Sequence, residues 1–343
     1  MIGRRLRASL RGWGGVGAMA AACAITLVLA LLLPLGGARG QDGTTDVGGQ
    51  GVARGTQARA KKCVVDPQDR SPAPSGADGP TIDAIKSRGR LIVGVDQNSY
   101  RWGYRDPNNL KSGSDLEGFD IDLVHAIAED ILGDPKAVQF RAVPTARRVE
   151  AIQKGEVDMV VRTMTITCKR LDDVVFSAPY FQTGQQVLAP TASKITGRDE
   201  SLAGKRICTA ASSTANEQLV EDRRKGRLVS SAKIIKPVPN QLDCLVRLQL
   251  GLADAVVTDG ALAASQAAQD PTVQLKGGTF TTEYYGVAMK KGPDDDLVRR
   301  VNKILADYRE SGWGRSYDKW LAPTLGEKSP SRTPPVPHYK QPT

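Results

Sequence analysis

Apolar residues recur in two alternating patterns between residues 82 and 321. Short runs such as "RLIVGVD" (90–96) and "AVQFRAV" (137–143) are almost continuously apolar, which predicts buried strands. Stretches such as "FDIDLVHAIAEDILG" (119–133) place apolar residues at helical spacing and end at a glycine, which predicts helices. Strands that alternate with helices indicate parallel sheets covered on both faces.

The alternation occurs in two successive sets, which suggests two α/β lobes. The first set runs from 82 to 164 and the second from 204 to 259. A strand at 282–291 and a long amphipathic helix at 294–312 follow. Ligands of such sheets bind beyond the carboxyl ends of the strands. In this chain those ends are Asp96 and Asp259, with the polar segments 163–170 and 212–214.

The segment "VRTMTITCKR" (161–170) has two interpretations. Strand alternation would place the hydroxyls of Thr163, Thr165 and Thr167 on one side, with Arg170 directly after them. The segment is then either an edge strand with a solvated face or a small anion site. In the second case hydroxyls and N–H groups converge on an oxygen that the arginine pairs with. Its position at the carboxyl end of a strand favours the anion site.

Both ends of the chain differ in composition from the body. Residues 1–40 carry arginines before an apolar run (18–35), the layout of an export signal or an N-terminal membrane anchor. Residues 41–80 are rich in Gly, Pro, Ala, Asp and Gln and predict a disordered tether. Residues 323–343 predict a disordered, Pro-rich tail. The body is therefore expected outside the cytoplasm, secreted or held at the outer face of the membrane.

The charge does not indicate a nucleic-acid-binding protein. Five arginines within residues 1–40 account for half of the formal net charge of +10, and only 5% of the residues are aromatic. A nucleic-acid site would need Lys and Arg clustered on an aromatic-rich surface.

Cysteine usage agrees with export. Beyond Cys23, the four cysteines Cys63, Cys168, Cys208 and Cys244 allow two disulfides with three possible pairings. No CxxC occurs, and the only histidines are His125 and His338, so neither a metal site nor a cofactor is expected.

Several motifs in the same order carry a family resemblance. They are "GFDIDL" after the strand that ends at Asp96, "GEVDMVV", "TMTITCKR", "FSAPYF", "LAGKRICTAASST" and "LADAVVTDG". Together they resemble the bacterial extracellular solute-binding proteins of family 3, which bind polar amino acids for ABC importers. The resemblance covers about 81–322. It is closest to the actinobacterial glutamate- and aspartate-binding branch, with which the chain shares "TMTxTC", "GKxVC" and "DC".

The resemblance implies a two-lobed fold of the periplasmic-binding-protein type II (Venus-flytrap) class. Each lobe would be a mainly parallel sheet flanked by helices. Lobe 1 would comprise 81–180 with 276–322, and lobe 2 would comprise 181–275. Two crossovers would form a hinge that lets the lobes close on the ligand.

The resemblance also assigns roles in the site. Arg170 would pair with the α-carboxylate of an amino acid, because a guanidinium grips a carboxylate through two parallel hydrogen bonds. Asp259 would accept the α-ammonium group, and Arg148 would bind a second carboxylate in the ligand's side chain. The other ligand-binding residues expected are Asp96, Trp102, Thr163, Thr165, Ser213 and Thr214. Where many members have small residues before "TxT", this chain has Arg162 and Thr163.

On this fold Cys208 and Cys244 would both fall in lobe 2, where a bridge does not block closure. That leaves Cys63 to pair with Cys168. We expect a monomeric, non-enzymatic binding protein that delivers glutamate or aspartate to an ABC permease, with asparagine and glutamine as the alternative ligands. An amino-acid sensor that signals to a membrane partner is the alternative, and an enzyme on this fold would need a general acid in the cleft.

Overall fold

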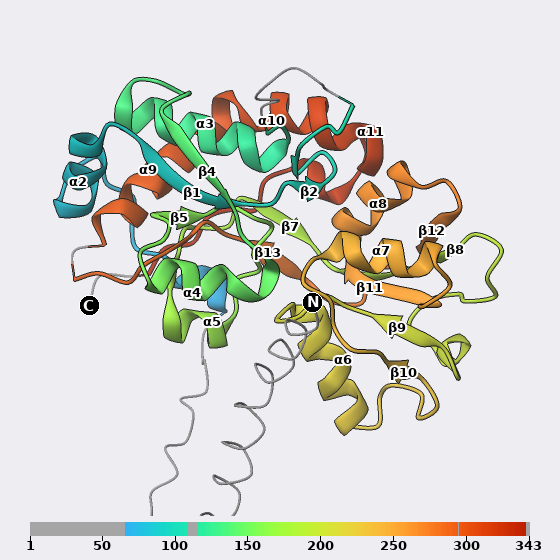
Figure 1. Ribbon diagram of the computed structural model, residues 1–343. Coiled ribbons are helices and arrows are strands. Elements are labelled where there is room, and N and C mark those ends of the chain that lie inside the picture. The colour runs from blue at the N-terminus through green and yellow to red at the C-terminus, as the bar shows by residue number, and fades with distance from the viewer. Residues whose placement is uncertain (1–65, 109–115, 294, 341–343) are drawn as a thin grey trace, which may run out of the picture. The chain divides into compact units, whose positions relative to one another are not determined.

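The computed structural model describes residues 66–108, 116–293 and 295–340. These residues form two five-stranded sheets, each with helices on both faces (Figure 1). The predicted two-lobed α/β architecture is confirmed. The predictions for residues 1–65, including the export signal, lie outside the described residues.

The first sheet belongs to lobe 1. Its strand order is β4 (Val138–Ala142), β1 (Leu91–Val95), β5 (Met159–Val160), β14 (Ala288–Met289) and β6 (Val175–Phe176). The pairs of β1 with β4 and β5 are parallel, whereas β14 runs antiparallel to both of its neighbours. The late strand β14 therefore returns to the lobe in which the chain started, and the sheet is mixed rather than purely parallel.

Helices cover this sheet on both faces because alternate side chains of a strand point to opposite sides. Leu91, Val93 and Val95 of β1 lie in one apolar cluster, whereas Ile92 packs against another. The first cluster includes residues of α2 (Pro80–Arg88), α3 (Phe119–Leu132) and α9 (Asp296–Ser311). The second cluster lies under α4 (Arg148–Gln153) and α5 (Cys168–Asp173).

The second sheet repeats this plan in lobe 2. Its strand order is β10 (Lys233–Ile234), β9 (Arg206–Cys208), β11 (Ala255–Asp259), β8 (Gln185–Pro190) and β12 (Val273–Lys276). Strand β8 runs antiparallel to both of its neighbours. Residues of α6 (Thr214–Arg224) pack on one face, and those of α7 (Gln241–Gln249) and α8 (Gly260–Gln269) pack on the other.

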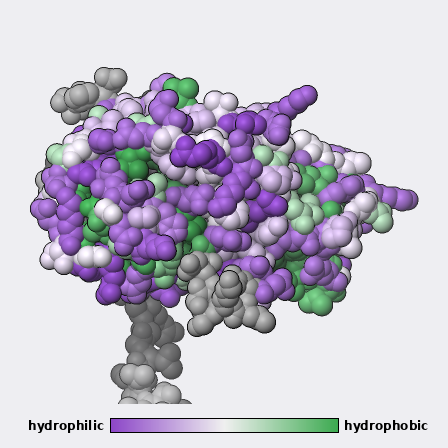
Figure 2. Space-filling view, turned by 90° about the horizontal axis from the view of Figure 1, so that it is seen from above, coloured by the Kyte–Doolittle hydropathy of each residue, from purple (hydrophilic) through white to green (hydrophobic). Residues whose placement is uncertain are grey.

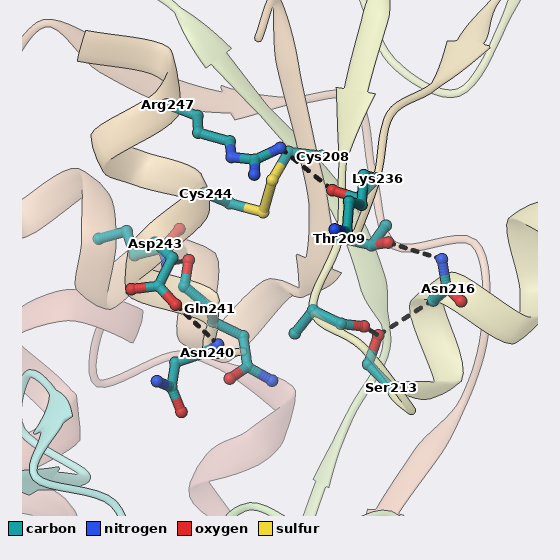
Figure 3. The surroundings of a disulfide bond; sticks show 12 residues. Cys208, Thr209, Ser213, Asn216, Lys236, Asn240, Gln241, Asp243, Cys244 and Arg247 are labelled. Atoms are coloured by element: carbon teal, nitrogen blue, oxygen red, sulfur yellow. Dashed lines mark hydrogen bonds between the residues drawn. A yellow bond between two sulfur atoms is a disulfide. The ribbon is translucent and has the colours of Figure 1, made fainter. Parts of the chain in front are cut away.

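A disulfide joins Cys208 of β9 to Cys244 of α7, the pairing expected for lobe 2 (Figure 3). Both cysteines are completely buried. The bridge lies close to the first turn of α7, where Asn240 and Asp243 form a capping box. It therefore ties the start of α7 to the sheet.

Two short strands mark the crossings between the lobes. β7 (Phe181–Thr183) and β13 (Glu283–Tyr285) pair antiparallel with each other and belong to neither five-stranded sheet. They form the pair of crossovers expected of a hinge.

The tether and the tail are shorter than predicted, which corrects their inner boundaries. Ser71 is 3% exposed, and its hydroxyl donates to the Phe176 carbonyl at 2.9 Å. The Ser71 carbonyl accepts from the Lys340 N–H at 2.7 Å. The two segments are held by hydrogen bonds of the Ser71 side chain and backbone, and such bonds leave no apolar periodicity in the sequence.

The described residues contain no helix that is long and apolar enough to cross a membrane. Polar and charged residues dominate the face shown in Figure 2, and hydrophobic residues form small separate groups among them. Such a distribution is ordinary for a face in contact with water.

Candidate functional site

The predicted site residues gather where strands end. Asp96 follows β1, Asp259 ends β11, and Ser213 caps α6 after β9. The segment 161–167 follows β5. The carboxyl ends of parallel strands meet at one edge of a sheet, and each lobe turns such an edge toward this site.

The segment 161–167 is not a strand, which corrects the idea of three hydroxyls on one face. Thr163 has a φ of 40°, in the left-handed region, so the chain bends there. Thr165 forms a single antiparallel bridge to Tyr285, and Thr167 caps α5 by accepting from the Arg170 N–H. The short helix α5 then turns the Arg170 side chain back over the segment.

Arg170 is a buried cation that lies between the lobes and has no carboxylate partner among the described residues. Its side chain donates to the Thr165 carbonyl at 2.6 Å in lobe 1 and to the Ser212 carbonyl at 3.0 Å in lobe 2. The residue is 9% exposed, and burial lowers the pKa of its guanidinium. Among the described residues no carboxylate forms an ion pair with it.

Arg148 is a second buried cation of the same kind. It is 3% exposed and donates to the Thr145 carbonyl at 3.1 Å and to the Arg162 carbonyl at 3.2 Å. Burial first, and then the charges of Arg170 and Arg162, hold its pKa well below the usual value. No ion pair to Arg148 is found within the described part of the chain. Leaving two neighbouring buried cations without carboxylates is costly, so together they favour a ligand that carries negative charge.

Arg162 is a third buried cation, and its role was not foreseen. It is 0% exposed, forms an ion pair with Asp96 at 2.8 Å, and donates to the Asn240 side-chain oxygen of lobe 2 at 3.0 Å. The Asp96 carboxylate also accepts from the Ser99 hydroxyl and from two backbone N–H groups. We therefore assign Asp96 to positioning Arg162 rather than to direct contact with a ligand. The sequence signals were a cation directly after the apolar run that ends at Val161 and the departure from the small residue that many family members have there.

Trp102 lies in the core of lobe 1. It is 0% exposed and packs edge-on against Phe119, Phe181 and Tyr285, with 4.9 Å between its ring centroid and that of Phe181. In the structure Trp102 is therefore a packing residue that contacts Phe181 and Tyr285 of the two hinge strands.

The serine and threonine at the start of α6 are occupied by protein partners. The Ser213 hydroxyl donates to the Ala210 carbonyl at 2.7 Å and accepts from the Asn216 N–H at 3.1 Å. The Thr214 hydroxyl donates to Glu283 at 3.0 Å. A ligand carboxylate near this helix would therefore be favoured by the N–H groups and dipole of α6 rather than by these hydroxyls.

Asp259 is a buried acid next to the arginines. It is 7% exposed and accepts from the Tyr285 hydroxyl at 2.6 Å. Burial, with the neighbouring charge of Glu283, raises its pKa to about 7. A positively charged group placed beside it would favour the ionised form.

Asp120 of the "GFDIDL" motif is a further buried acid that was not predicted. It is 2% exposed and accepts from the Tyr180 hydroxyl at 2.9 Å and from the Thr163 N–H at 3.0 Å. These bonds hold the bend at Thr163 in place. Burial raises the pKa of Asp120 to about 7.

The raised pKa of Asp120 predicts a pH-dependent stability. Between about pH 4 and about pH 7 the folded protein binds a proton that the unfolded chain has released, so stability falls as the pH rises. We expect the free energy of unfolding of the ligand-free protein to drop by roughly 1–3 kcal/mol between about pH 5 and about pH 8. Asp259 contributes in the same direction. Urea denaturation across this range measures the effect, and Asp120→Asn should flatten it. A stability that rises with pH would contradict the assignment.

Cys168 is disulfide-bonded, and Cys63, its expected partner, lies outside the described residues.

Within the described ranges, no group of three or more His, Cys, Asp or Glu side chains could hold a metal ion.

Comparison with known proteins places the chain in one family. Residues 91–323 match the model of "Bacterial extracellular solute-binding proteins, family 3". The ABC transporter glutamine-binding protein GlnH of Bacillus subtilis is 33% identical over 242 residues, covering 70% of this chain and 84% of that protein. The glutamate-binding protein GluB of Corynebacterium efficiens is 30% identical over 261 residues, covering 74% and 84%.

Solved structures show the same architecture. The solute receptor for L-cysteine of Neisseria gonorrhoeae superimposes with a TM-score of 0.66 at 28% identity, covering 75% of this chain and all of that one. An ancestral arginine-binding protein bound to glutamine gives a TM-score of 0.59 at 35% identity, covering 70% and 99%. Both bind amino acids, and their ligands differ, L-cysteine in the first and glutamine in the second.

Proposed function

The chain belongs to the bacterial extracellular solute-binding proteins of family 3, and from this premise we propose that it binds L-glutamate or L-aspartate outside the cytoplasm and delivers it to an ABC importer. Amino-acid binding follows from the family. The preference for an acidic amino acid is supported by one observation on this chain. Arg148 and Arg170 are both buried, lie near each other, and have no carboxylate partner among the described residues.

The hydrogen bonds of the two arginines leave donors for a ligand. A guanidinium has five N–H donors, and each of these side chains uses two on protein carbonyls. The remaining donors of Arg170 suit the α-carboxylate in a bidentate arrangement, and those of Arg148 suit the side-chain carboxylate. Asp259 then takes the α-ammonium group. An uncharged ligand side chain would leave the Arg148 charge buried and unpaired.

Lobe closure follows from where these groups lie. Arg148 and Arg170 belong to lobe 1, whereas Asp259 and the start of α6 belong to lobe 2. A ligand can form hydrogen bonds to both sets of residues only when the lobes are together. Binding therefore shifts the population toward the closed form. The closed form is then the state that an importer recognises.

Calorimetric titration of the oxidised protein against the twenty amino acids tests this proposal. Glutamate and aspartate should bind at least about tenfold more tightly than glutamine and asparagine, because a buried charged group left without partners costs roughly 1–3 kcal/mol. If glutamine or a cationic amino acid binds best, the acidic specificity is wrong. If no amino acid binds, amino-acid delivery itself is wrong.

A further inference from the structure

Four buried polar residues form a connected set at the hinge. Gln185 begins β8 and Asp259 ends β11, and they are direct partners in the antiparallel pair of these strands. Their side chains therefore lie on the same face. Glu283 and Tyr285 are two residues apart in β13, so they also share a face. We call these four residues the hinge quartet.

Hydrogen bonds join the hinge quartet in two pairs. The Gln185 side-chain nitrogen donates to the Glu283 carboxylate at 2.7 Å, and the Tyr285 hydroxyl donates to the Asp259 carboxylate at 2.6 Å. None of the four residues is more than 7% exposed. The hinge strand β13 thus contributes one member to each pair, and lobe 2 contributes the other.

The hinge quartet has acceptors left over. The Gln185 side-chain oxygen is buried without a hydrogen-bond partner, although the residue is only 1% exposed. The second oxygen of the Asp259 carboxylate has no donor among the described residues. Glu283 accepts one bond from Gln185 and one from Thr214, and within the described ranges neither acid has an ion pair to Lys or Arg. Such a site can accept a hydrogen-bond donor that carries a positive charge.

An open cavity reaches two members of the hinge quartet, Gln185 and Glu283, and Asp259 lies beside them as the strand partner of Gln185. The cavity has a volume of about 430 Å³, and its lining includes Thr165, Gln185, Thr214 and Glu283. Gln185 and Glu283 are thus at once bonded to each other and in contact with space that a ligand can enter. An ammonium group carries three N–H donors, and the Asp259, Gln185 and Glu283 oxygens supply three acceptors.

We propose that Gln185 and Glu283 complete, together with Asp259, the receptor for the ammonium group of the bound amino acid. This inference rests on the proposed function and deepens it, because it adds one residue of lobe 2 and one of the hinge strand to the acid expected to hold the ammonium group. Each of the three acceptors receives one N–H, and the positive charge offsets the two buried carboxylates. Because Glu283 lies on β13, the ammonium group also contacts the hinge itself.

The groups around Asp259 couple ammonium binding to the release of a proton. Asp259 faces Glu283 and Tyr285 of β13, and Arg170 of α5 and Arg148 of α4 act on it from lobe 1. Since its pKa is about 7 without ligand, part of the Asp259 population is protonated at neutral pH. Arrival of an ammonium group favours the ionised form, so binding should release a fraction of a proton.

Comparing L-glutamate with glutarate tests the inference, because glutarate has the same carbon chain and both carboxylates but no ammonium group. We expect Gln185→Leu and Glu283→Gln to lower the affinity for glutamate by roughly 10- to 150-fold, the range for lost hydrogen bonds to a charged group. Glutarate binding should stay within about threefold of wild type, which also shows that the variants are folded. Gln182→Leu, an exposed position on β7, is the matched control and should change neither ligand.

Proton release gives a second readout. Titrations at pH 7 in phosphate and in Tris should show a fraction of a proton released by glutamate and none by glutarate. Glu283→Gln should reduce the release, because Asp259 loses the neighbouring charge that favours its protonated form.

The two proposals fail in different ways. If wild type binds an amino acid but both variants bind glutamate as wild type does, or lose glutamate and glutarate equally, the ammonium receptor is overturned. If wild type binds no amino acid, the proposed function is overturned first. If another amino acid binds best, that amino acid and its des-amino analogue replace glutamate and glutarate in the same design.

Discussion

Replacing Arg170 by alanine should lower the affinity for glutamate and aspartate by about 100- to 1,000-fold. The Arg170 side chain is buried between the lobes and donates to a carbonyl in each, at Thr165 and Ser212. Its remaining donors are those assigned to the α-carboxylate. Breaking a buried charge pair by removing one partner costs roughly 3–5 kcal/mol, and a loss of 100- to 1,000-fold, about 3–4 kcal/mol, lies in the lower part of that range. Calorimetric titration of the variant measures it.

Two further variants separate binding from folding. Arg170→Lys keeps the charge but cannot form two parallel hydrogen bonds, so it should recover little of the affinity. Lys169→Ala changes the neighbouring exposed cation, which pairs with Glu217 at 2.7 Å, and should bind ligand nearly as wild type does. If Arg170→Ala loses less than about tenfold while remaining folded, the arginine does not hold the carboxylate.

Replacing Arg148 by methionine should change which amino acids bind. We expect glutamate and aspartate to lose about 100-fold in affinity, because their second carboxylate would be buried without a cation. Glutamine should stay within about threefold of its wild-type affinity or improve, because the unpaired guanidinium would no longer oppose it. Titrating all four ligands against the variant gives the specificity ratio directly.

Arg147→Met is the matched control for this change. Its side chain is 50% exposed and pairs with Glu150 and Glu156 at the surface. Exposed pairs of this kind contribute about 0–1 kcal/mol, so the specificity ratio should not move. An equal loss for glutamate and glutamine in Arg148→Met would mean that Arg148 supports the fold and does not read the ligand side chain.

The sequence determined the order of strands and helices in both lobes. β1, α3, β9 and β11 fall where local periodicity and glycine stops predict them, because burial of one face imposes a period of two or 3.6 on a strand or helix. The placement of Asp259 at the end of β11, and of the segment that leads from β5 to Arg170, follows from the same order. Arg148 was placed by resemblance, since its helix is only six residues long.

Only the tertiary structure decided which polar groups meet. Arg162 pairs with Asp96 of its own lobe and donates to Asn240 of the other lobe. Gln185 donates to Glu283, which lies 98 residues further along the chain. The same holds for Ser71, which bonds to Phe176 and to Lys340, both far from it along the chain. Such contacts join single side chains that are far apart along the chain, so they leave no repeating pattern. A periodic core fixes the scaffold locally, whereas the chemistry of this site depends on the lobes, the hinge strands and the termini being folded around it.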